Sequence, residues 1–287
     1  MPWYAITDPQ DPKLDELAIQ FHLHPLHVED CRAPHERAKA ERDSDYLFVI
    51  LNIFVMPNAA DVTFASLCIF VGKEFLITVC DNQCASAGML ERAQRAEPDA
   101  KPGKLFYLIF DAVVDAYLPA VDKFGEHIDD LQDRVLEDPR SSVLHEIFGH
   151  KRDLAQMRRM LVHTRDVCLF VQRDADDLTG KHLRPYFRDI YDHIARNLDA
   201  VELERDLLTN TLDVYLSSVA NRTNEVMKVL TVLSTIALPC LVISSIYGMN
   251  IKGIPFLDSE HGIEIVTGMM AMTTVVLLVM LKKFRWL

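Results

Sequence analysis

The sequence predicts an α/β N-terminal domain, then long helices that form a stalk, and finally two C-terminal transmembrane helices. Three observations lead to this fold class. Residues 1–104 hold runs of β-branched and aromatic residues, residues 105–228 repeat apolar residues at helical spacing, and the remainder holds two long uncharged apolar runs. The chain of 287 residues is long enough for two or three units with cores of their own.

The first 104 residues are expected to form a small sheet with helices. WYAI at 3–6 is a short strand candidate, and PQDPKLDELAIQF at 9–21 is typical of a turn followed by a helix. YLFVILNIFV at 46–55 indicates a strand, and SLCIFVGKEFLITV at 66–79 indicates two strands joined by a turn at GKE. We expect a mostly antiparallel or mixed sheet in a small α/β unit.

From Leu105 the pattern changes to long helices. Residues 105–138 keep a helical period, and this helix is expected to stop at Pro139. A second helix is expected to begin with a serine N-cap in SSVLHE, at residues 141–146, and to continue to about Arg173. After an acidic turn, Pro185 is expected at the first position of a third helix.

The third helix contains no convincing breaker between Tyr186 and Pro239. Its apolar residues recur at spacings of three and four, typical of a packed stripe: Leu198, Val201, Leu208, Leu212, Tyr215, Val219 and Val226. Some 60 helical residues are roughly 90 Å long. Because the stripe leads directly into the first apolar run, we expect one helix to connect the cytosol with the membrane.

Two runs near the C-terminus are long and apolar enough to cross a bilayer. Residues 229–251 and 265–281 contain no charged side chain, and about 20 apolar residues span a hydrocarbon core of roughly 30 Å. We therefore predict transmembrane helices at these positions, an outer loop at 252–264 and a basic C-terminus at 282–287. The alternative is a pair of buried core helices, which would be unusual at the end of a soluble domain.

Basic residues on both flanks predict the orientation. Arg222 and Lys228 precede the first run, and Lys282, Lys283 and Arg285 follow the second. Positively charged flanks remain on the cytoplasmic side. The protein is therefore expected to cross the cell (inner) membrane twice, with both termini in the cytoplasm and a short loop outside. The polar, acidic start of the chain does not resemble a cleavable signal peptide.

Composition narrows the choice of partners. The net charge of −12 argues against nucleic acid and suits cations, metal ions included. The six cysteines lack the spacing of a disulfide framework, which favours a reducing compartment. Cys80 and Cys84 form a single C-x3-C pair, and His22, His24 and His27 are more typical of structural or solvated histidines than of a metal site. No P-loop, nucleophile-elbow or HExxH pattern indicates an enzyme or an organic cofactor.

One face of the first apolar run mixes small polar residues with Met and Leu. Its members are Asn224, Met227, Leu230 or Thr231, Ser234, Leu238, Leu241 and Ser245. Polar side chains at membrane depth normally face protein or water, and one or two helices cannot enclose water. If this face lines a pore, several copies must assemble around an axis. The residues alone leave a second interpretation open, in which Thr231, Ser234 and Ser245 are small residues at helix–helix contacts.

The run ends in Tyr247-Gly248-Met249-Asn250, which favours the pore. Gly248 allows the backbone to leave helical geometry and to approach an axis closely. Asn250 supplies a neutral amide oxygen, and a ring of such oxygens suits Mg²⁺, which loses its water reluctantly and can be held through that water. Carboxylates would bind too tightly for release, and apolar rings deeper in the span can close by dewetting.

YGMN after an apolar run, followed by a second apolar run and the basic end KKFRWL, resembles the CorA family of divalent-cation transporters. The resemblance extends over essentially the whole chain. Further segments that resemble the family are LHPLHVED (23–30), YLFVIL (46–51), PYFRDIYDH (185–193) and LDVYLSSVANRTNEVMKVL (212–230).

The resemblance implies a homopentameric channel in the lipid bilayer, with a cytoplasmic funnel and a pore lined by the first span. It implies influx of hydrated Mg²⁺, with Co²⁺ or Ni²⁺ tolerated, without nucleotide hydrolysis. The ion-selective outer entrance then consists of Tyr247, Gly248, Met249 and Asn250. The pore below is lined by Asn224, Met227, Leu230, Ser234, Leu238, Leu241 and Ser245.

The resemblance also implies regulation by Mg²⁺ bound between cytoplasmic subunits. Asp189 and His193 are four residues apart and share a helix face, and with Asp111 they match positions of the family's cytoplasmic metal site. An acidic partner is expected just after Cys80, but CASAGMLERAQ lacks it, although Asp81 is close. The alternative is a solvated acidic patch with an ion-paired histidine.

The outer loop departs from the family pattern. IKGIPFLDSEHG replaces the Met-Pro-Glu pattern of many relatives, and GIP is similar to the zinc-handling branch of the superfamily. Asp258 and Glu260 would concentrate cations at the mouth, whereas Lys252, closer to Asn250, opposes this. Two alternatives therefore remain beside a magnesium channel: a transporter of zinc or another transition metal, and a membrane-tethered ion sensor that does not conduct.

Overall fold

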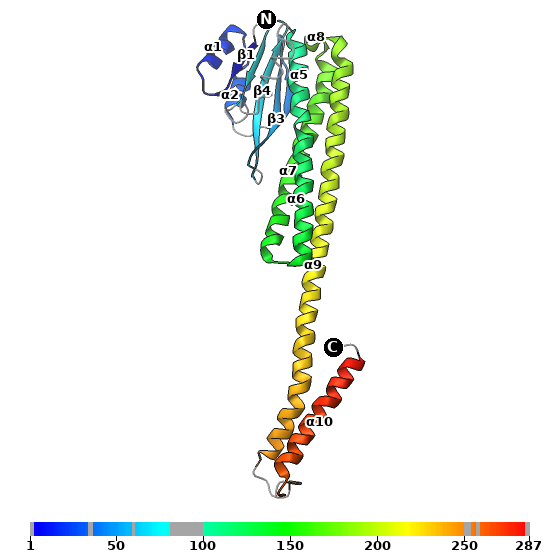
Figure 1. Cartoon of the computed structure of the whole chain (residues 1–287). Helices are drawn as coiled ribbons and strands as arrows, with labels where there is room; N and C mark the ends of the chain where they lie inside the picture. The colour runs from blue at the N-terminus through cyan, green and yellow to red at the C-terminus, as the bar shows by residue number, and fades with distance from the viewer. Residues whose placement is uncertain are drawn as a thin grey trace. The chain divides into compact units, whose positions relative to one another are not determined.

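The structure is a computed structural model, which describes residues 3–33, 37–58, 61–80, 100–249, 254–256 and 259–284. The chain divides into two compact units, Met1–Val214 and Tyr215–Leu287. Helix α9 (Arg184–Tyr247) contributes residues to both units (Figure 1). The domain boundaries expected at residues 104 and 228 mark changes in the sequence pattern, whereas the two units are defined by their internal packing. These boundaries therefore stay predictions.

The first unit begins with a five-stranded mixed sheet in the order β1-β5-β4-β3-β2. Among the described strands, β1 and β5 pair in parallel, and the other neighbouring strands are antiparallel. This confirms the small α/β unit with a mixed sheet. The elements are β1 (Trp3–Ile6), α1 (Lys13–Gln20), α2 (Pro25–Arg32), β2 (Lys39–Arg42), β3 (Tyr46–Asn58), β4 (Asp61–Gly72) and β5 (Leu76–Val79).

Both faces of the sheet are covered, which explains its nearly continuous apolar strands. On one face α1 and α2 pack Leu14, Leu17 and Val28 against Phe48 and Phe70. On the other face lies α5, as Figure 1 shows. The turn predicted at GKE joins β4 to β5, with the Gly72 N–H donating to the Phe75 carbonyl at 3.0 Å.

His24 and His27, at the start of α2, have hydrogen-bond partners within the fold, whereas the side chain of His22 is exposed. The Tyr46 hydroxyl accepts the backbone N–H of His24 at 2.8 Å and lies 2.8 Å from Nδ1 of His27. The hydroxyl has one hydrogen and two lone pairs and can pair with both groups, and the Nε2 of His27 lies 3.1 Å from a carboxylate oxygen of Glu41. Both ring nitrogens of this buried side chain thus have partners, and neither is free to bind a metal.

The helices of the first unit follow the sheet. They are α5 (Pro102–Asp115), α6 (Tyr117–Glu137), α7 (Ser141–Asp174), the short α8 (Asp176–Thr179), the 3₁₀ helix η1 (Lys181–Leu183) and the first part of α9. The prediction of a single helix over 105–138 is wrong, because α5 and α6 are separated at Ala116. Pro119 explains the break, since it has no N–H to donate to the carbonyl of Asp115, and its ring crowds that carbonyl.

Two predicted helix starts also need correction. The N-cap of α7 is Arg140, with an extended backbone and no side-chain cap, so Ser141 is already helical. The predicted serine N-cap is therefore wrong. Pro185 is the second rather than the first residue of α9, because Arg184 has helical angles of φ −50° and ψ −46°. Proline is tolerated at both positions, since neither N–H has an intrahelical partner.

The second unit consists of the last part of α9 and α10 (Gly262–Lys283). In the described part of the chain, α9 and α10 are the helices long and apolar enough to cross a membrane, and none of their apolar windows is buried. Large exposed side chains, such as Leu238 and Met272, would face water without a bilayer or further subunits. Both features fit the predicted transmembrane helices and argue against buried core helices.

Candidate functional site

The predicted pore face of α9 is exposed throughout the second unit. Leu230, Leu238 and Leu241 are 56%, 64% and 64% exposed. The remaining residues predicted for this face are exposed as well: Asn224, Met227, Ser234 and Ser245. They recur at three- and four-residue spacing and therefore form one stripe along the helix.

A different face of α9 is partly covered. Its members are Thr231, Val232, Thr235, Ile236, Pro239, Cys240, Ile243 and Tyr247. At 3.6 residues per turn, the centre of this face lies roughly 150° around the helix from the centre of the predicted pore face.

Helix α10 provides the cover. The Cys240 Sγ lies 3.4 Å from the Thr274 Oγ1 of α10, and a cavity has Thr231 and Thr235 of α9 opposite Leu277 and Leu281 of α10. The predicted pore face is thus the side of α9 that α10 leaves open.

The last turn of α9 continues into the GMN segment. The Gly248 N–H donates to the Ser244 carbonyl at 2.9 Å, and the Met249 N–H donates to the Ile246 carbonyl at 3.2 Å. A Cβ at Gly248 would lie 3.1 Å from the Ser244 carbonyl oxygen, which is tighter than ordinary contact. Asn250, the central residue of the predicted entrance, lies outside the described residues.

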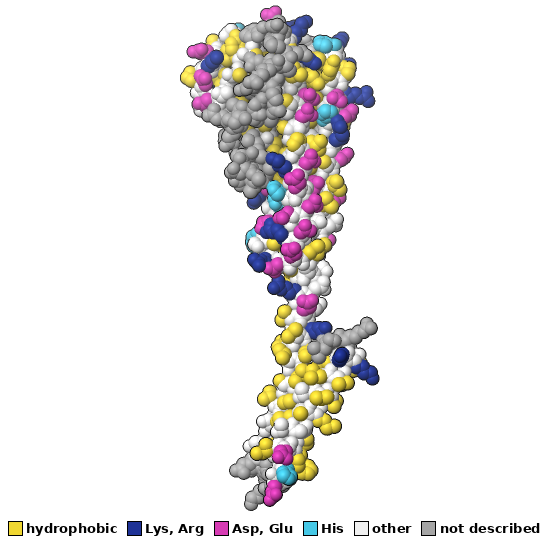
Figure 2. Space-filling view, viewed as in Figure 1, with side chains coloured by type: hydrophobic (Ala, Val, Ile, Leu, Met, Phe, Trp, Pro, Cys, Tyr) yellow, Lys and Arg dark blue, Asp and Glu magenta, His cyan; other side chains and the backbone are white. Residues whose placement is uncertain are grey.

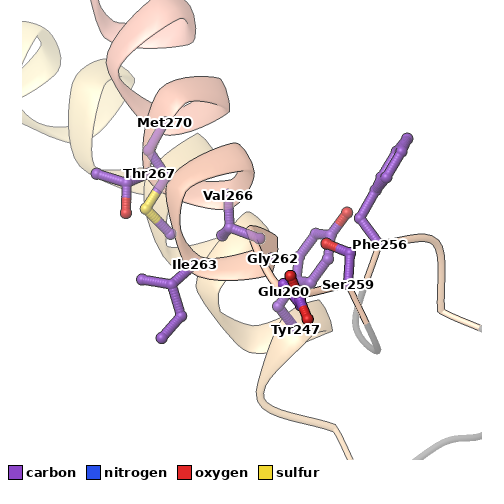
Figure 3. A pocket seen from close by; sticks show the side chains of 9 residues that line it. All are labelled: Tyr247, Phe256, Ser259, Glu260, Gly262, Ile263, Val266, Thr267 and Met270. Atoms are coloured by element: carbon purple, nitrogen blue, oxygen red, sulfur yellow. The ribbon is translucent and has the colours of Figure 1, made fainter.

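Tyr247 lies on the α10 side rather than on the pore face. It lines a cavity of about 430 Å³ between the end of α9 and the start of α10. In Figure 3, Tyr247, Ser259 and Glu260 gather at one end of this cavity. Phe256 also lines it, and the other lining residues belong to α10. The predicted charges at 252 and 258 lie outside the part of the chain that the structure describes, so Glu260 is the described acidic residue of this loop.

A cluster of metal-ligating groups lies between α5 and α9 in the first unit. Single ligand atoms of Asp111, Asp115 and His193 all lie within 4.8 Å of one another. His193 stands between two carboxylates, with its Nδ1 3.1 Å from Asp115 and its Nε2 3.6 Å from Asp189. The structure thus brings together the three predicted residues and adds Asp115. Asp115 is four residues after Asp111, and this helical spacing could have indicated that the two carboxylates share a face.

The electrostatics of this cluster favour a cation. Burial raises the pKa of the Asp111 carboxyl, and the neighbouring Asp115 raises it further. Burial also raises the pKa of Tyr107 to about 12, with Asp111 and Asp189 adding to the effect. Lys104 partly offsets the negative charge, and its ammonium lies 4.6 Å from the centre of the Tyr107 ring. A divalent ion would relieve the remaining repulsion between the carboxylates.

The donor set fits a divalent cation. Carboxylate oxygens suit Mg²⁺, whereas an imidazole nitrogen suits Zn²⁺, Co²⁺ and Ni²⁺ better. The acidic partner expected near Asp81 lies outside the described residues. On the face shown in Figure 2, acidic side chains gather along the helices of the first unit, and hydrophobic side chains cover those of the second.

Comparisons with known proteins agree with this arrangement. The model of the family described as CorA-like Mg²⁺ transporter protein matches residues 1–283. The "Cobalt/magnesium transport protein CorA" of Thermotoga maritima is 35% identical over 278 residues, covering 93% of this chain and 78% of that protein.

Solved structures show the same fold over nearly the whole chain. The complete structure of the CorA magnesium transporter from Methanocaldococcus jannaschii has a TM-score of 0.88 at 23% identity, covering 99% of this chain and 91% of that one. The structure of the full-length CmaX protein has a TM-score of 0.75 at 19% identity, covering 99% and 88%. These matches confirm an α/β N-terminal domain, a long helix and two C-terminal apolar helices, and the chain belongs to the CorA-like Mg²⁺ transporter family.

Proposed function

We propose that this chain is one subunit of a homopentameric channel that admits hydrated Mg²⁺ into the cell, with Co²⁺ or Ni²⁺ also accepted. The observation that carries the proposal is the open face of α9. In the second unit α10 covers the other side of the helix, and the stripe from Met227 to Ser245 is left exposed. A stripe that mixes Leu and Met with Ser suits a narrow aqueous pore between identical helices better than a surface that faces only lipid.

The stripe provides both polar and apolar rings in such an assembly. Ser234 and Ser245 would hydrogen-bond to the water around the ion, whereas Leu238 and Leu241 would form a constriction that closes by dewetting. Gly248, Met249 and Asn250 would form the outer entrance, where amide oxygens bind the water shell of Mg²⁺. Tyr247, on the α10 side of the helix, would support the entrance rather than contact the ion.

The cluster of Asp111, Asp115, Asp189 and His193 would report the cytosolic ion concentration. Divalent cations bound there would offset the repulsion between acidic groups and hold the channel closed, and their loss would loosen the first unit. Because α9 carries His193 and also the pore stripe, a change around His193 has a direct route along one helix. In this arrangement the protein lies in the cell membrane with both termini in the cytoplasm.

A second cargo has one observation in its favour. His193 contributes a nitrogen donor, and the names of the relatives include cobalt as well as magnesium. A channel whose principal cargo is Zn²⁺ or another transition ion therefore ranks second. A membrane-tethered sensor without conduction ranks below both, because it leaves the exposed polar stripe of α9 without a role.

Parallel uptake measurements separate these functions. The purified protein is reconstituted into liposomes that contain ion-sensitive dyes, and Mg²⁺, Co²⁺ and Zn²⁺ are added outside in separate runs. We expect Mg²⁺ entry that Co²⁺ inhibits by competition. Entry of Zn²⁺ without Mg²⁺ would favour the second function, and entry of none of the three ions would favour the sensor.

A further inference from the structure

Helices α6 and α7 each contribute a histidine to a second cluster. This cluster shares neither helices nor residues with the Asp111 cluster. The rings of His127 on α6 and His150 on α7 have centroids 5.8 Å apart and planes only 23° from parallel. Phe124 meets the His150 ring edge-on, with a centroid distance of 5.7 Å. Two imidazoles thus face each other across a helix pair, with an apolar ring on one side.

One ring nitrogen of His150 is unpaired in the described part of the chain. Its Nδ1 is buried and has no hydrogen-bond partner among the described residues. A buried polar atom without a partner is unfavourable and uncommon. Glu146, one turn before His150, is already held by Arg134 through hydrogen bonds of 2.7 and 2.8 Å. The fold therefore leaves Nδ1 unpaired although an acidic side chain stands nearby.

The environment disfavours the charged form of this imidazole. Burial lowers the pKa of His150, and the neighbouring His127 lowers it further, whereas Asp153 and Glu146 act in the opposite direction. Neutral imidazole is the form that binds metal ions, because its unprotonated nitrogen offers a lone pair.

We propose that His127 and His150 together bind a divalent transition ion of the class that prefers imidazole, such as Zn²⁺, Co²⁺ or Ni²⁺. Two imidazoles that share one tetrahedral ion, with metal–nitrogen distances of about 2.0–2.1 Å, have centroids roughly 5 Å apart. The observed centroid separation of 5.8 Å is close to this value. Because the nitrogen lone pairs lie in the ring planes, binding would also turn the stacked rings until one nitrogen of each points to the ion. Water completes the coordination, and Mg²⁺ is disfavoured because it requires oxygen ligands.

The ion would bridge α6 to α7 and fix one helix against the other. The inference does not depend on conduction, because it concerns binding by two helices of the first unit. It gives the chain a response to transition ions separate from its response to Mg²⁺. The competing explanation is aromatic stacking, in which the two rings only pack against each other and Phe124.

Counting bound zinc tests the site. The full-length protein in detergent is dialysed to equilibrium against micromolar free Zn²⁺ with millimolar Mg²⁺, and zinc per chain is measured for the parent, His127→Gln and His150→Gln. Glutamine fills a similar volume and keeps a polar group. His145→Gln is the matched control on α7, because its ring is exposed and its Nδ1 lies 2.8 Å from the Ser141 carbonyl of its own helix, away from the two stacked rings.

We expect His127→Gln and His150→Gln each to lose one zinc ion per chain, and the double variant to lose no more than either single one. His145→Gln keeps the parent count, and His193→Ala changes the count independently, because it belongs to the other cluster. Circular dichroism checks that helix content is unchanged, and His127→Ala repeats the test should glutamine perturb the fold. Equal zinc counts in the parent and all variants at 127 and 150 would overturn the proposal and leave the rings as packing only.

Discussion

Asp111 occupies a position where metal binding and stability oppose each other. Its carboxyl lies half-buried beside Asp115, and both burial and that neighbour raise its pKa. In an acid whose folded pKa is raised, the charged form destabilises the fold above that pKa, and the penalty disappears as the pH falls through it. A divalent ion bound to the cluster would offset this free-energy cost.

The substitution Asp111→Asn should therefore stabilise the metal-free protein at neutral pH. We expect about 1 kcal/mol or less, because the side chain is only half-buried and solvent screens its charge. The advantage over the parent should shrink as the pH is lowered through the acidic range. The variant should also lose much of the stabilisation that Mg²⁺ or Co²⁺ gives the parent. Thermal unfolding with a chelator and with each ion measures both effects.

Asp213→Asn is the control, since this exposed carboxylate lies on the same helix as His193 but outside the cluster. It should change neither quantity. A loss of stability in chelator on changing Asp111 would contradict the repulsion described here.

Gly103 packs against backbone and leaves no space for a side chain. A Cβ there would lie 2.7 Å from the Thr179 Cα and 2.8 Å from its carbonyl carbon. Backbone cannot rotate away as a side chain can, so Gly103→Ala should destabilise the first unit by about 1–3 kcal/mol. Gly149→Ala is the matched control, because a Cβ there meets nothing within 4 Å. It should be neutral or gain about 0.5–1 kcal/mol from helix propensity. Denaturation of both variants tests this, and equal effects would contradict it.

The sequence predicts part of the cytoplasmic cluster, for a local reason. Asp189 and His193 share a face because helix geometry alone fixes the direction of residues four apart. The contact of His193 with Asp115 depends on the register in which α9 packs against α5, and periodicity does not contain that register. The spacing of Asp115 from Asp111 places both on one face of α5. Predicting the contact of Asp115 with His193 also requires knowing that this face packs against α9.

The two faces of α9 should differ in their access to thiol reagents. Cysteines placed one at a time at Leu241 and Ser245 should react with a membrane-impermeant thiol reagent when Mg²⁺ is chelated, and the reaction should block flux. Cysteines at Thr235 and Ile243, on the α10 side, should react slowly. The background carries Cys240→Ala, since this native thiol lies in the same span.

Reactivity should follow the helical period of the pore face, at steps of three and four residues. Reactivity that is equal on both faces, or stronger at Thr235 and Ile243, would contradict the assignment of this face to the pore.

Helix identity is predicted well, but helix ends are not. Uncharged length predicts α10 and the last part of α9, because few other structures tolerate such runs. The division of α5 from α6 was missed because apolar periodicity continues across Ala116, while the decisive residue, Pro119, acts on a carbonyl four residues earlier. The start of α7 at Ser141 was misplaced because several residues there are compatible with a cap.

The acidic charge of the protein as a whole needs counterions. The chain has a net charge of −12, so a pentamer would bring five such charges together. We expect cytosolic Mg²⁺ to inhibit flux by neutralising this charge between subunits. Asp189→Asn should shift the inhibition to several-fold higher Mg²⁺, because it removes a carboxylate next to His193.

Flux from liposomes with buffered internal Mg²⁺ measures this shift for channels oriented with the first unit inside. Asp213→Asn again serves as the control and should keep the parent's inhibition curve. Unchanged inhibition in Asp189→Asn would remove this residue from the regulatory site.

The central claim is that ions cross the membrane through a ring formed by the GMN segment, and replacing Asn250 tests it most directly. Mg²⁺ flux is measured in proteoliposomes for the parent, Asn250→Ala and the control Ser244→Ala, which changes a side chain on α9 away from the pore stripe. All three proteins are first shown to have the same oligomeric mass, expected at five times the 32.7 kDa chain. We predict background flux for Asn250→Ala and near-parent flux for Ser244→Ala. Parent-level flux in an assembled Asn250→Ala variant would contradict the account.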